Sequence, residues 1–126
     1  MKTEAVIYVA DLDAMTEFYR RGIGLLDGEA GDGYRGLEAG CATVWLVRAG
    51  QGMIRGLDGE SRPPRSEAPI KLAFQVRSIE QVAPAIISLG GSIKPNSWQF
   101  AGYNRRDAVD PEGNILQLLE PLAASK

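Results

Sequence analysis

The sequence predicts an α+β fold in which two βαβββ modules form a single domain of 126 residues. Residues 4–25 and 71–92 form a weak internal repeat, in which Val9 corresponds to Val76. In each copy an alternating apolar pattern, typical of a strand, passes into apolar residues at helical spacing. We place the first module at about 1–49, a linker at about 50–69 and the second module at about 70–122.

The first module is expected to begin with a strand that ends near Val9, followed by a helix capped by Asp11. Apolar residues recur at helical spacing behind this cap, namely Leu12, Met15, Phe18 and Tyr19, and Gly22 and Gly24 are expected to stop the helix. The segment 28–36 (GEAGDGYRG) predicts a hairpin turn between strands near 24–28 and 34–39. A further strand is expected over 41–48 (CATVWLVR).

The second module repeats this plan. Its first strand alternates, with Ile70, Leu72, Phe74 and Val76 on one side, and Ser78 with Gln81 has the form of a capping box for the following helix. Pro84 predicts a late start or a kink in that helix, and Gly90 and Gly91 are expected to end it. Strands are then expected in 93–100, 103–109 and 115–121, the last after the turn DPEGN (110–114). The linker contains four glycines and three prolines.

Composition excludes several classes of function. A net charge of −2 and scattered basic residues give no electrostatic basis for binding nucleic acid, and no apolar run has the length of a membrane span or signal peptide. The chain is therefore expected to be cytoplasmic. The one cysteine, Cys41, is expected to be a small buried apolar residue. Because the chain has no histidine, Ser-His-Asp and Cys-His nucleophiles and histidine-based iron and zinc sites are excluded.

Two motifs resemble those of a known superfamily. The run from Val9 to Leu25 contains Val-x-Asp-Leu, Phe-Tyr and Ile-Gly-Leu in order, and Asp110 to Leu118 contains Asp-Pro-Glu-Gly-Asn followed by Gln-Leu. Together they resemble the glyoxalase/bleomycin-resistance/extradiol dioxygenase superfamily over nearly the whole chain. The resemblance implies the vicinal oxygen chelate fold, in which two βαβββ modules form a cupped, half-open mixed β-barrel. The scaffold supports several chemistries, so it does not by itself fix a function.

The resemblance also implies where a metal would bind. Metal-dependent relatives take one ligand from the first strand and one from the last strand of each module. The corresponding positions here are Glu4, Lys71, Gln117 and one residue of 44–46 (VWL), whose register the sequence leaves open. This explains a polar residue inside the apolar run ILQLLE: Gln117 is expected to face the cavity, with Leu116 and Leu118 on the helix side. A protonated lysine offers no lone pair, so neither a metal nor another cofactor is expected.

We therefore expect a binding cavity with polar and aromatic residues. Glu4 and Lys71 are expected to approach each other across the pseudo-two-fold axis, either as a salt bridge that fills an unused metal site or as anchors for a ligand. The other candidate ligand-binding residues are Tyr8, Trp45, Gln75, Trp98, Tyr103 and Gln117, and Phe100 is a further aromatic candidate for the cavity wall.

Two functions follow from different classes. The first is a metal-free protein that binds a drug or metabolite, similar to the bleomycin-resistance branch with its role in antibiotic resistance. The alternative is a glyoxalase-like lyase or isomerase, either metal-independent, with Glu4 as base and Lys71 as oxyanion stabiliser, or metal-dependent. Whether the protein is an enzyme stays open at this point. The expected partners are a small molecule and a second copy in a homodimer, because open strand edges are rarely left to solvent.

Overall fold

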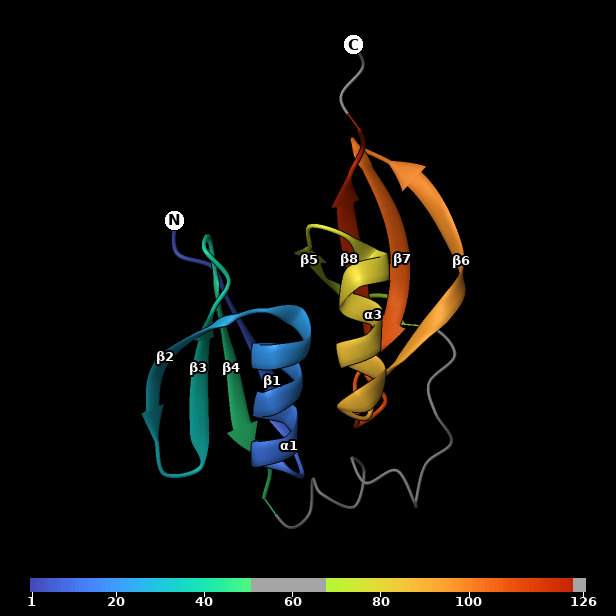
Figure 1. Cartoon of the computed structure of the whole chain (residues 1–126). Coiled ribbons are helices and arrows are strands. Elements are labelled where there is room, and N and C mark those ends of the chain that lie inside the picture. The colour runs from blue at the N-terminus through green and yellow to red at the C-terminus, as the bar shows by residue number, and fades with distance from the viewer. Residues whose placement is uncertain (51–67, 124–126) are drawn as a thin grey trace.

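The computed structural model describes residues 1–50 and 68–123, and these form two βαβββ units (Figure 1). The first contains β1 (Glu4–Val9), α1 (Leu12–Glu17), the π-helical turn η1 (Phe18–Ile23), β2 (Leu26–Gly31), β3 (Tyr34–Glu38) and β4 (Thr43–Arg48). The second contains β5 (Leu72–Gln75), α3 (Ile79–Ser88), β6 (Ser92–Phe100), β7 (Tyr103–Val109) and β8 (Ile115–Pro121). Both predicted modules are present, and most of the predicted linker lies outside the described residues.

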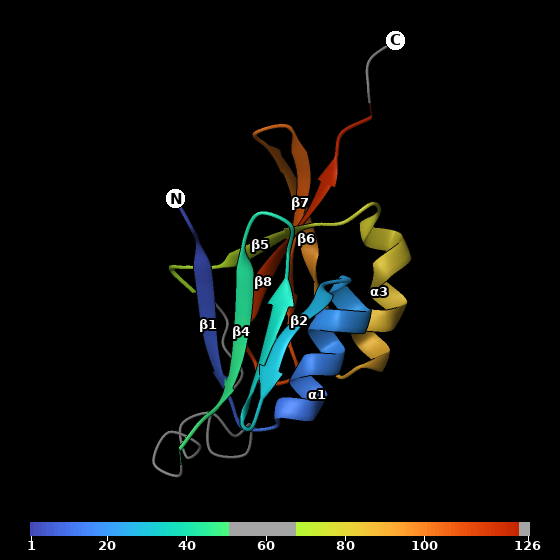
Figure 2. The same cartoon turned by 90° about the vertical axis from the view of Figure 1, so that its left-hand side faces the viewer.

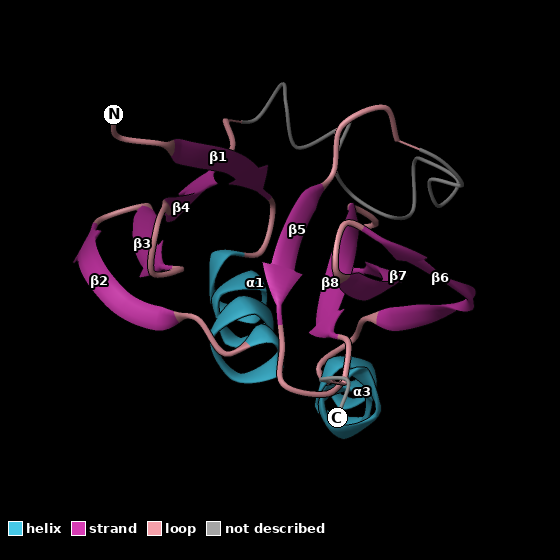
Figure 3. Ribbon diagram, turned by 90° about the horizontal axis from the view of Figure 1, so that it is seen from above, coloured by secondary structure: helices cyan, strands magenta, loops and turns pink. Residues whose placement is uncertain are grey.

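Each unit forms its own mixed sheet, which confirms the predicted α+β, half-open architecture. The strand orders are β1-β4-β3-β2 and β5-β8-β7-β6, with the first strand of each unit parallel to the last and the other pairs antiparallel. Among the described residues no hydrogen-bonded pairing joins the two sheets. Figures 2 and 3 show the strands of each sheet beside the helix of the same unit.

Both helices are capped by the residues that the sequence predicts. The Asp11 carboxylate accepts a hydrogen bond from the Ala14 amide, and the Ser78 hydroxyl accepts one from the Gln81 amide. The second helix begins at Ile79 and includes Pro84, so the expected late start is wrong. Gly24, with φ +100°, ends the first helical segment in the left-handed conformation that glycine adopts without steric cost. Gly22 does not stop that segment but lies within η1.

The hairpin of the first unit is tighter than predicted. The sequence places the turn at 28–36, but β2 continues to Gly31 and β3 begins at Tyr34. Asp32-Gly33 is the turn, with Gly33 at φ +80°, and the other glycines of the segment belong to strands or a bulge. Cys41 lies in the connection to β4 and is exposed, so its predicted burial is also wrong.

One apolar core spans both units. It includes Phe18 and Tyr19 of η1 together with Phe74, Leu116 and Leu118 of the second sheet. The centre of the Tyr19 ring lies 5.0 Å from the centre of the Phe18 ring and 5.8 Å from the centre of the Phe74 ring. The two units are therefore held together mainly by burial of apolar surface between helix and sheet.

The turn DPEGN links the units through polar contacts. Asp110, only 2% exposed, accepts hydrogen bonds from the Tyr19 hydroxyl at 2.8 Å and from its own turn, while the Glu112 carboxylate accepts from the Ala10 and Asp11 amides. Burial raises the pKa of Tyr19 well above its ordinary value, and the Asp110 carboxylate adds to this increase. The loop before β8 is thus anchored to the start of the first helix.

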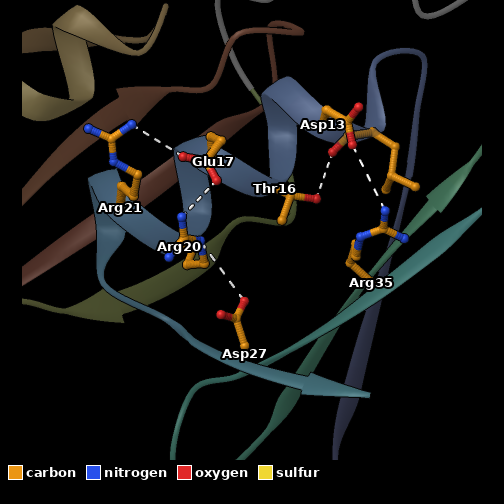
Figure 4. A network of polar contacts seen from close by, with 8 residues as sticks. Asp13, Thr16, Glu17, Arg20, Arg21, Asp27 and Arg35 are labelled. Atoms are coloured by element: carbon orange, nitrogen blue, oxygen red, sulfur yellow. Dashed lines mark hydrogen bonds and ion pairs between the residues drawn. The ribbon is translucent and has the colours of Figure 1, made fainter. Parts of the chain in front are cut away.

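The outer surface of α1 and η1 carries a charged network (Figure 4). Glu17 accepts hydrogen bonds from Arg20 and Arg21, and these bonds lower the pKa of its carboxyl. Arg20 also lies 4.0 Å from Asp27 of β2. All these groups are solvated, so we assign the network little stabilising energy. In the described residues no helix is long and apolar enough to cross a bilayer.

Candidate functional site

Each sheet has one face that packs on the helices and one that does not. On β1 the side chains of Glu4, Val6 and Tyr8 point away from the core, because they alternate with Ala5, Ile7 and Val9. We call Glu4, Val6, Tyr8 and Trp45 the first open face. By the same alternation and the strand register, the second open face comprises Lys71, Gln75, Trp98, Phe100, Tyr103, Arg105, Asp107 and Gln117.

The structure settles the register that the sequence leaves open in β4. Val6 lies opposite Trp45 in the first sheet, just as Ala73 lies opposite Gln117 in the second. Trp45 is therefore the counterpart of Gln117. Its indole N–H donates a 2.5 Å hydrogen bond to the Glu4 carboxylate, so the two predicted site residues of the first sheet meet. As predicted, Leu116 and Leu118 face the core and Gln117 does not.

A polar network crosses the second open face. The Lys71 ammonium lies 2.7 Å from the Asp107 carboxylate, with the two side chains 28% and 13% exposed. Gln117 donates to Asp107 at 3.3 Å and accepts from the Arg105 guanidinium at 2.9 Å. Residues of β7 and β8, together with the residue just before β5, thus form one continuous set of hydrogen bonds, from Lys71 to Arg105.

Asp107 and Arg105 also lie on the second open face, and they are not among the residues predicted from the sequence. The signal is the alternation in YNRRDAV, which places Tyr103, Arg105 and Asp107 on one face and Ala108 in the core. Asp107 lies directly opposite Gln117 of β8. Side chains opposite each other on neighbouring strands interact, so a polar residue predicted at position 117 points to position 107 for its partner.

The predicted approach of Glu4 and Lys71 to each other is wrong as a direct contact. Lys71 pairs with Asp107 of its own sheet. Glu4 bonds Trp45 and lies 3.7 Å from the ammonium of Lys2. Pseudo-symmetry relates the two charges, but each of them has a partner in its own sheet.

The aromatic residues of the predicted cavity wall gather mainly on the second sheet. The Tyr103 hydroxyl donates to the Gln75 side chain at 3.2 Å. Trp98 lies opposite Arg105 on the neighbouring strand, and Phe100 lies opposite Tyr103. Trp98 is 39% exposed and Phe100 64%, so both rings offer surface to a ligand.

The donor set at the four implied ligand positions does not fit a divalent metal. Trp45 offers only an N–H, Lys71 offers an ammonium that is already paired, and the Gln117 carbonyl oxygen accepts from Arg105. Glu4 is the single carboxylate, whereas hard cations need several oxygen ligands. Within the described ranges no cluster of three or more His, Cys, Asp or Glu side chains could hold a metal ion.

A pocket of about 400 Å³ lies where the two units meet. Val6 and Tyr8 of β1 form part of its lining, with Leu72 of β5 and Ile115 of β8 on the other side. This volume falls in the range of small-molecule sites, and the lining is predominantly apolar. The pocket adjoins the first open face through Val6 and Tyr8.

Replacing Asp107 with alanine is expected to lower the free energy of unfolding by about 1–2 kcal/mol, because half-buried Lys71 loses its anion and Gln117 loses an acceptor. The double variant Lys71→Met with Asp107→Leu should recover most of this loss. Urea unfolding measures both. Asp27→Ala, which removes the carboxylate of an exposed 4.0 Å pair, is the control and should change little. Equal effects of Asp107→Ala and Asp27→Ala would contradict a stabilising role for the network.

Comparison with known proteins identifies the fold. No family model matches the sequence, and no curated protein does. Among solved structures, a glyoxalase/bleomycin resistance protein/dioxygenase family enzyme from Burkholderia phytofirmans PsJN is 20% identical with a TM-score of 0.70, over 95% of this chain and 98% of that chain. A glyoxalase/bleomycin resistance protein from Albidiferax ferrireducens T118 is 20% identical with a TM-score of 0.66, over 95% of this chain and 98% of that chain. A glyoxalase-related enzyme from Fulvimarina pelagi is 18% identical with a TM-score of 0.66, over 98% and 93%. The chain therefore has the vicinal oxygen chelate fold of the glyoxalase/bleomycin resistance/dioxygenase proteins.

Proposed function

We propose that this protein binds a small organic molecule on its open faces, without a metal and without changing the molecule chemically. The observation that carries the proposal is the network from Lys71 to Arg105. At Lys71 and Gln117, where metal-dependent relatives would hold an ion, this chain has donors and acceptors that bond to one another. The exposed aromatic rings beside the network supply apolar contact area.

The enzyme alternative has less support from the geometry. An oxyanion stabiliser acts best as a preorganised, uncompensated donor, but the Lys71 ammonium is neutralised by Asp107 at 2.7 Å. The Glu4 carboxylate, as a base, would first have to release the indole N–H of Trp45. Neither group is poised for proton transfer or charge stabilisation, so binding without chemistry is the simpler function.

The test is a thermal-shift screen of antibiotics and metabolites, repeated after treatment with a chelator. Hits should raise the melting temperature equally before and after chelation, and mass spectrometry should recover each hit unchanged. The double variant Gln75→Ala with Gln117→Ala should lose the shift. The matched variant Gln81→Ala with Gln99→Ala lies outside the open faces and should keep it. A shift that disappears with the chelator, or a hit that returns as product, would overturn the proposal.

We also propose a homodimer. Strands β1, β2, β5 and β6 are edge strands of the described sheets, and Val6 of β1 and Leu26 of β2 expose large apolar side chains there. Pairing of two copies would cover such edges. Light scattering at micromolar concentration should give twice the chain mass of 13.6 kDa, and a monomer mass under these conditions would count against pairing.

A further inference from the structure

One part of the second open face is built differently from the rest. Arg105 shares this face with the aromatic residues Trp98, Phe100 and Tyr103, which the register of β6 and β7 brings together. The Arg105 guanidinium carbon lies 5.0 Å from the centre of the Phe100 ring and 5.9 Å from that of Tyr103. We call these four residues the arginine–aromatic patch.

The structure fixes the guanidinium in place and leaves part of it available. Its Nε donates to the Phe100 carbonyl at 3.0 Å and Nη1 donates to Gln117 at 2.9 Å, so the side chain is held from two sides. Among the described residues Arg105 forms no ion pair and Nη2 makes no hydrogen bond, whereas Lys71 has its carboxylate. A fixed guanidinium with free N–H groups is well suited to bind a carboxylate.

The local charge of the second open face also favours an anionic ligand. Leaving out β6, the face carries two cations, Lys71 just before β5 and Arg105 of β7, and one anion, Asp107, so +2 and −1 leave +1. Arg105 provides this excess, in surroundings of aromatic rings rather than carboxylates. The chain as a whole has a net charge of −2, so the local sign is opposite to the global one.

We propose that the patch binds a planar aromatic carboxylate, whose ring packs against Trp98 and Phe100 and whose carboxylate takes the free N–H groups of Arg105. This inference rests on the proposed binding function and specifies the chemical class of its ligand. It predicts that anionic aromatic molecules bind better than neutral or cationic ones, the reverse of what the acidic overall charge suggests.

The first test compares three probes of the same shape: 2-naphthoate, 2-naphthamide and 2-naphthylmethylammonium. Calorimetry should give the carboxylate at least roughly tenfold tighter binding than the amide, the difference expected for a hydrogen-bonded charge. Amide or ammonium binding as tight as the carboxylate would overturn the carboxylate preference and leave the binding function standing. Binding of none of the three would also overturn the inference, and the thermal-shift screen decides the binding function separately.

The second test locates the charge with two neighbouring arginines. Arg105 and Arg106 are both half-buried on β7, but they lie on opposite faces, and Arg106 donates to the Lys94 carbonyl. Arg105→Gln should weaken the binding of 2-naphthoate roughly ten- to hundredfold and leave the affinity for 2-naphthamide unchanged. Arg106→Gln makes the same change in net charge but should leave both affinities unchanged. Equal weakening by the two variants would show that only the overall charge matters and would overturn the inference.

The two tryptophans report the position of the probe. The chain contains only Trp45 and Trp98, and in a nitrogen–proton correlation spectrum each gives one indole signal. Bound 2-naphthoate should shift the Trp98 signal most, whereas the Trp45 indole is held by Glu4 on the other sheet. A larger shift of Trp45 would place the probe on the first open face and would contradict the patch as its site.

Discussion

Replacing Asp110 with alanine is expected to cost about 4 kcal/mol of the free energy of unfolding, a large part of the about 5–15 kcal/mol that holds a domain of this kind folded. The carboxylate is 2% exposed and has partners on both units. Within its own turn it accepts from the amides of Glu112 and Asn114 and from the Asn114 side chain. From the first unit it accepts a hydrogen bond from the Tyr19 hydroxyl.

The cost is large because alanine removes the acceptor and leaves the donors behind. The Tyr19 hydroxyl would stay buried without a partner, and the turn that begins β8 would lose the bonds that close it. The same turn presents Glu112 to the amides of Ala10 and Asp11, so a loosened turn also weakens the contact between the units. Gln117 on β8 would then lose its fixed position relative to the first sheet.

Chemical unfolding of a series of variants separates these contributions. Tyr19→Phe removes a single bond to Asp110 and should cost about 1–2 kcal/mol. Asp110→Asn keeps the shape of the side chain but loses acceptor capacity, so its loss of unfolding free energy should lie between those of Tyr19→Phe and Asp110→Ala. Asp13→Ala, whose carboxylate is 92% exposed, is the control and should change stability little. A loss below about 1 kcal/mol for Asp110→Ala would show that the turn does not bind the units together.

Tyr19 also gives this contact a dependence on alkaline pH. Its pKa in the folded state is raised above the ordinary value of 10.0, so its contribution to stability is complete below pH 10 and is lost as the pH rises through the folded-state pKa. The wild type should therefore lose stability more steeply than Tyr19→Phe above about pH 10. Parallel curves for the two proteins would contradict this.

The sequence is sufficient for those features that depend on local chemistry. Asp11 and Ser78 cap their helices because a side-chain oxygen next to a free amide satisfies it in any context. Gln117 faces away from the core because alternation along a strand is strict. The DPEGN turn forms because Asp110 bonds its own backbone and Gly113 adopts φ +87°.

Features that depend on the register between strands are harder to predict. The partner of Lys71 is set by which residue of β7 lies opposite Gln117, and the role of Trp45 by which residue of β4 lies opposite Val6. The register follows from turns such as Asp32-Gly33, which a segment with several glycines conceals. Contacts between units, such as Glu112 with Ala10, join residues far apart in sequence, so no local pattern indicates them.

Gly91→Ala is the other substitution with a large expected effect, about 3 kcal/mol or more. Gly91 connects α3 to β6, and its φ lies outside the left-handed region, so backbone strain is not the reason. A Cβ there would lie 2.5 Å from a ring carbon of Phe18 and 2.6 Å from the carbonyl oxygen of Val109. The first is buried in the shared core, and the second belongs to the backbone of a paired strand.

Neither neighbour can move at low cost. A shift of Phe18 would disturb its contact with Tyr19, and a shift of Val109 would separate β7 from β6 or β8. Gly22→Ala is the matched control, because that glycine lies in the same interface but its Cβ would stay at least 3.5 Å from Leu89 and Ile86. Urea unfolding should show a large loss for Gly91→Ala and little change for Gly22→Ala. If both variants were equally stable, packing between η1, α3 and the second sheet would be loose enough to absorb a methyl group, and these elements could not hold the two open faces in a fixed relation.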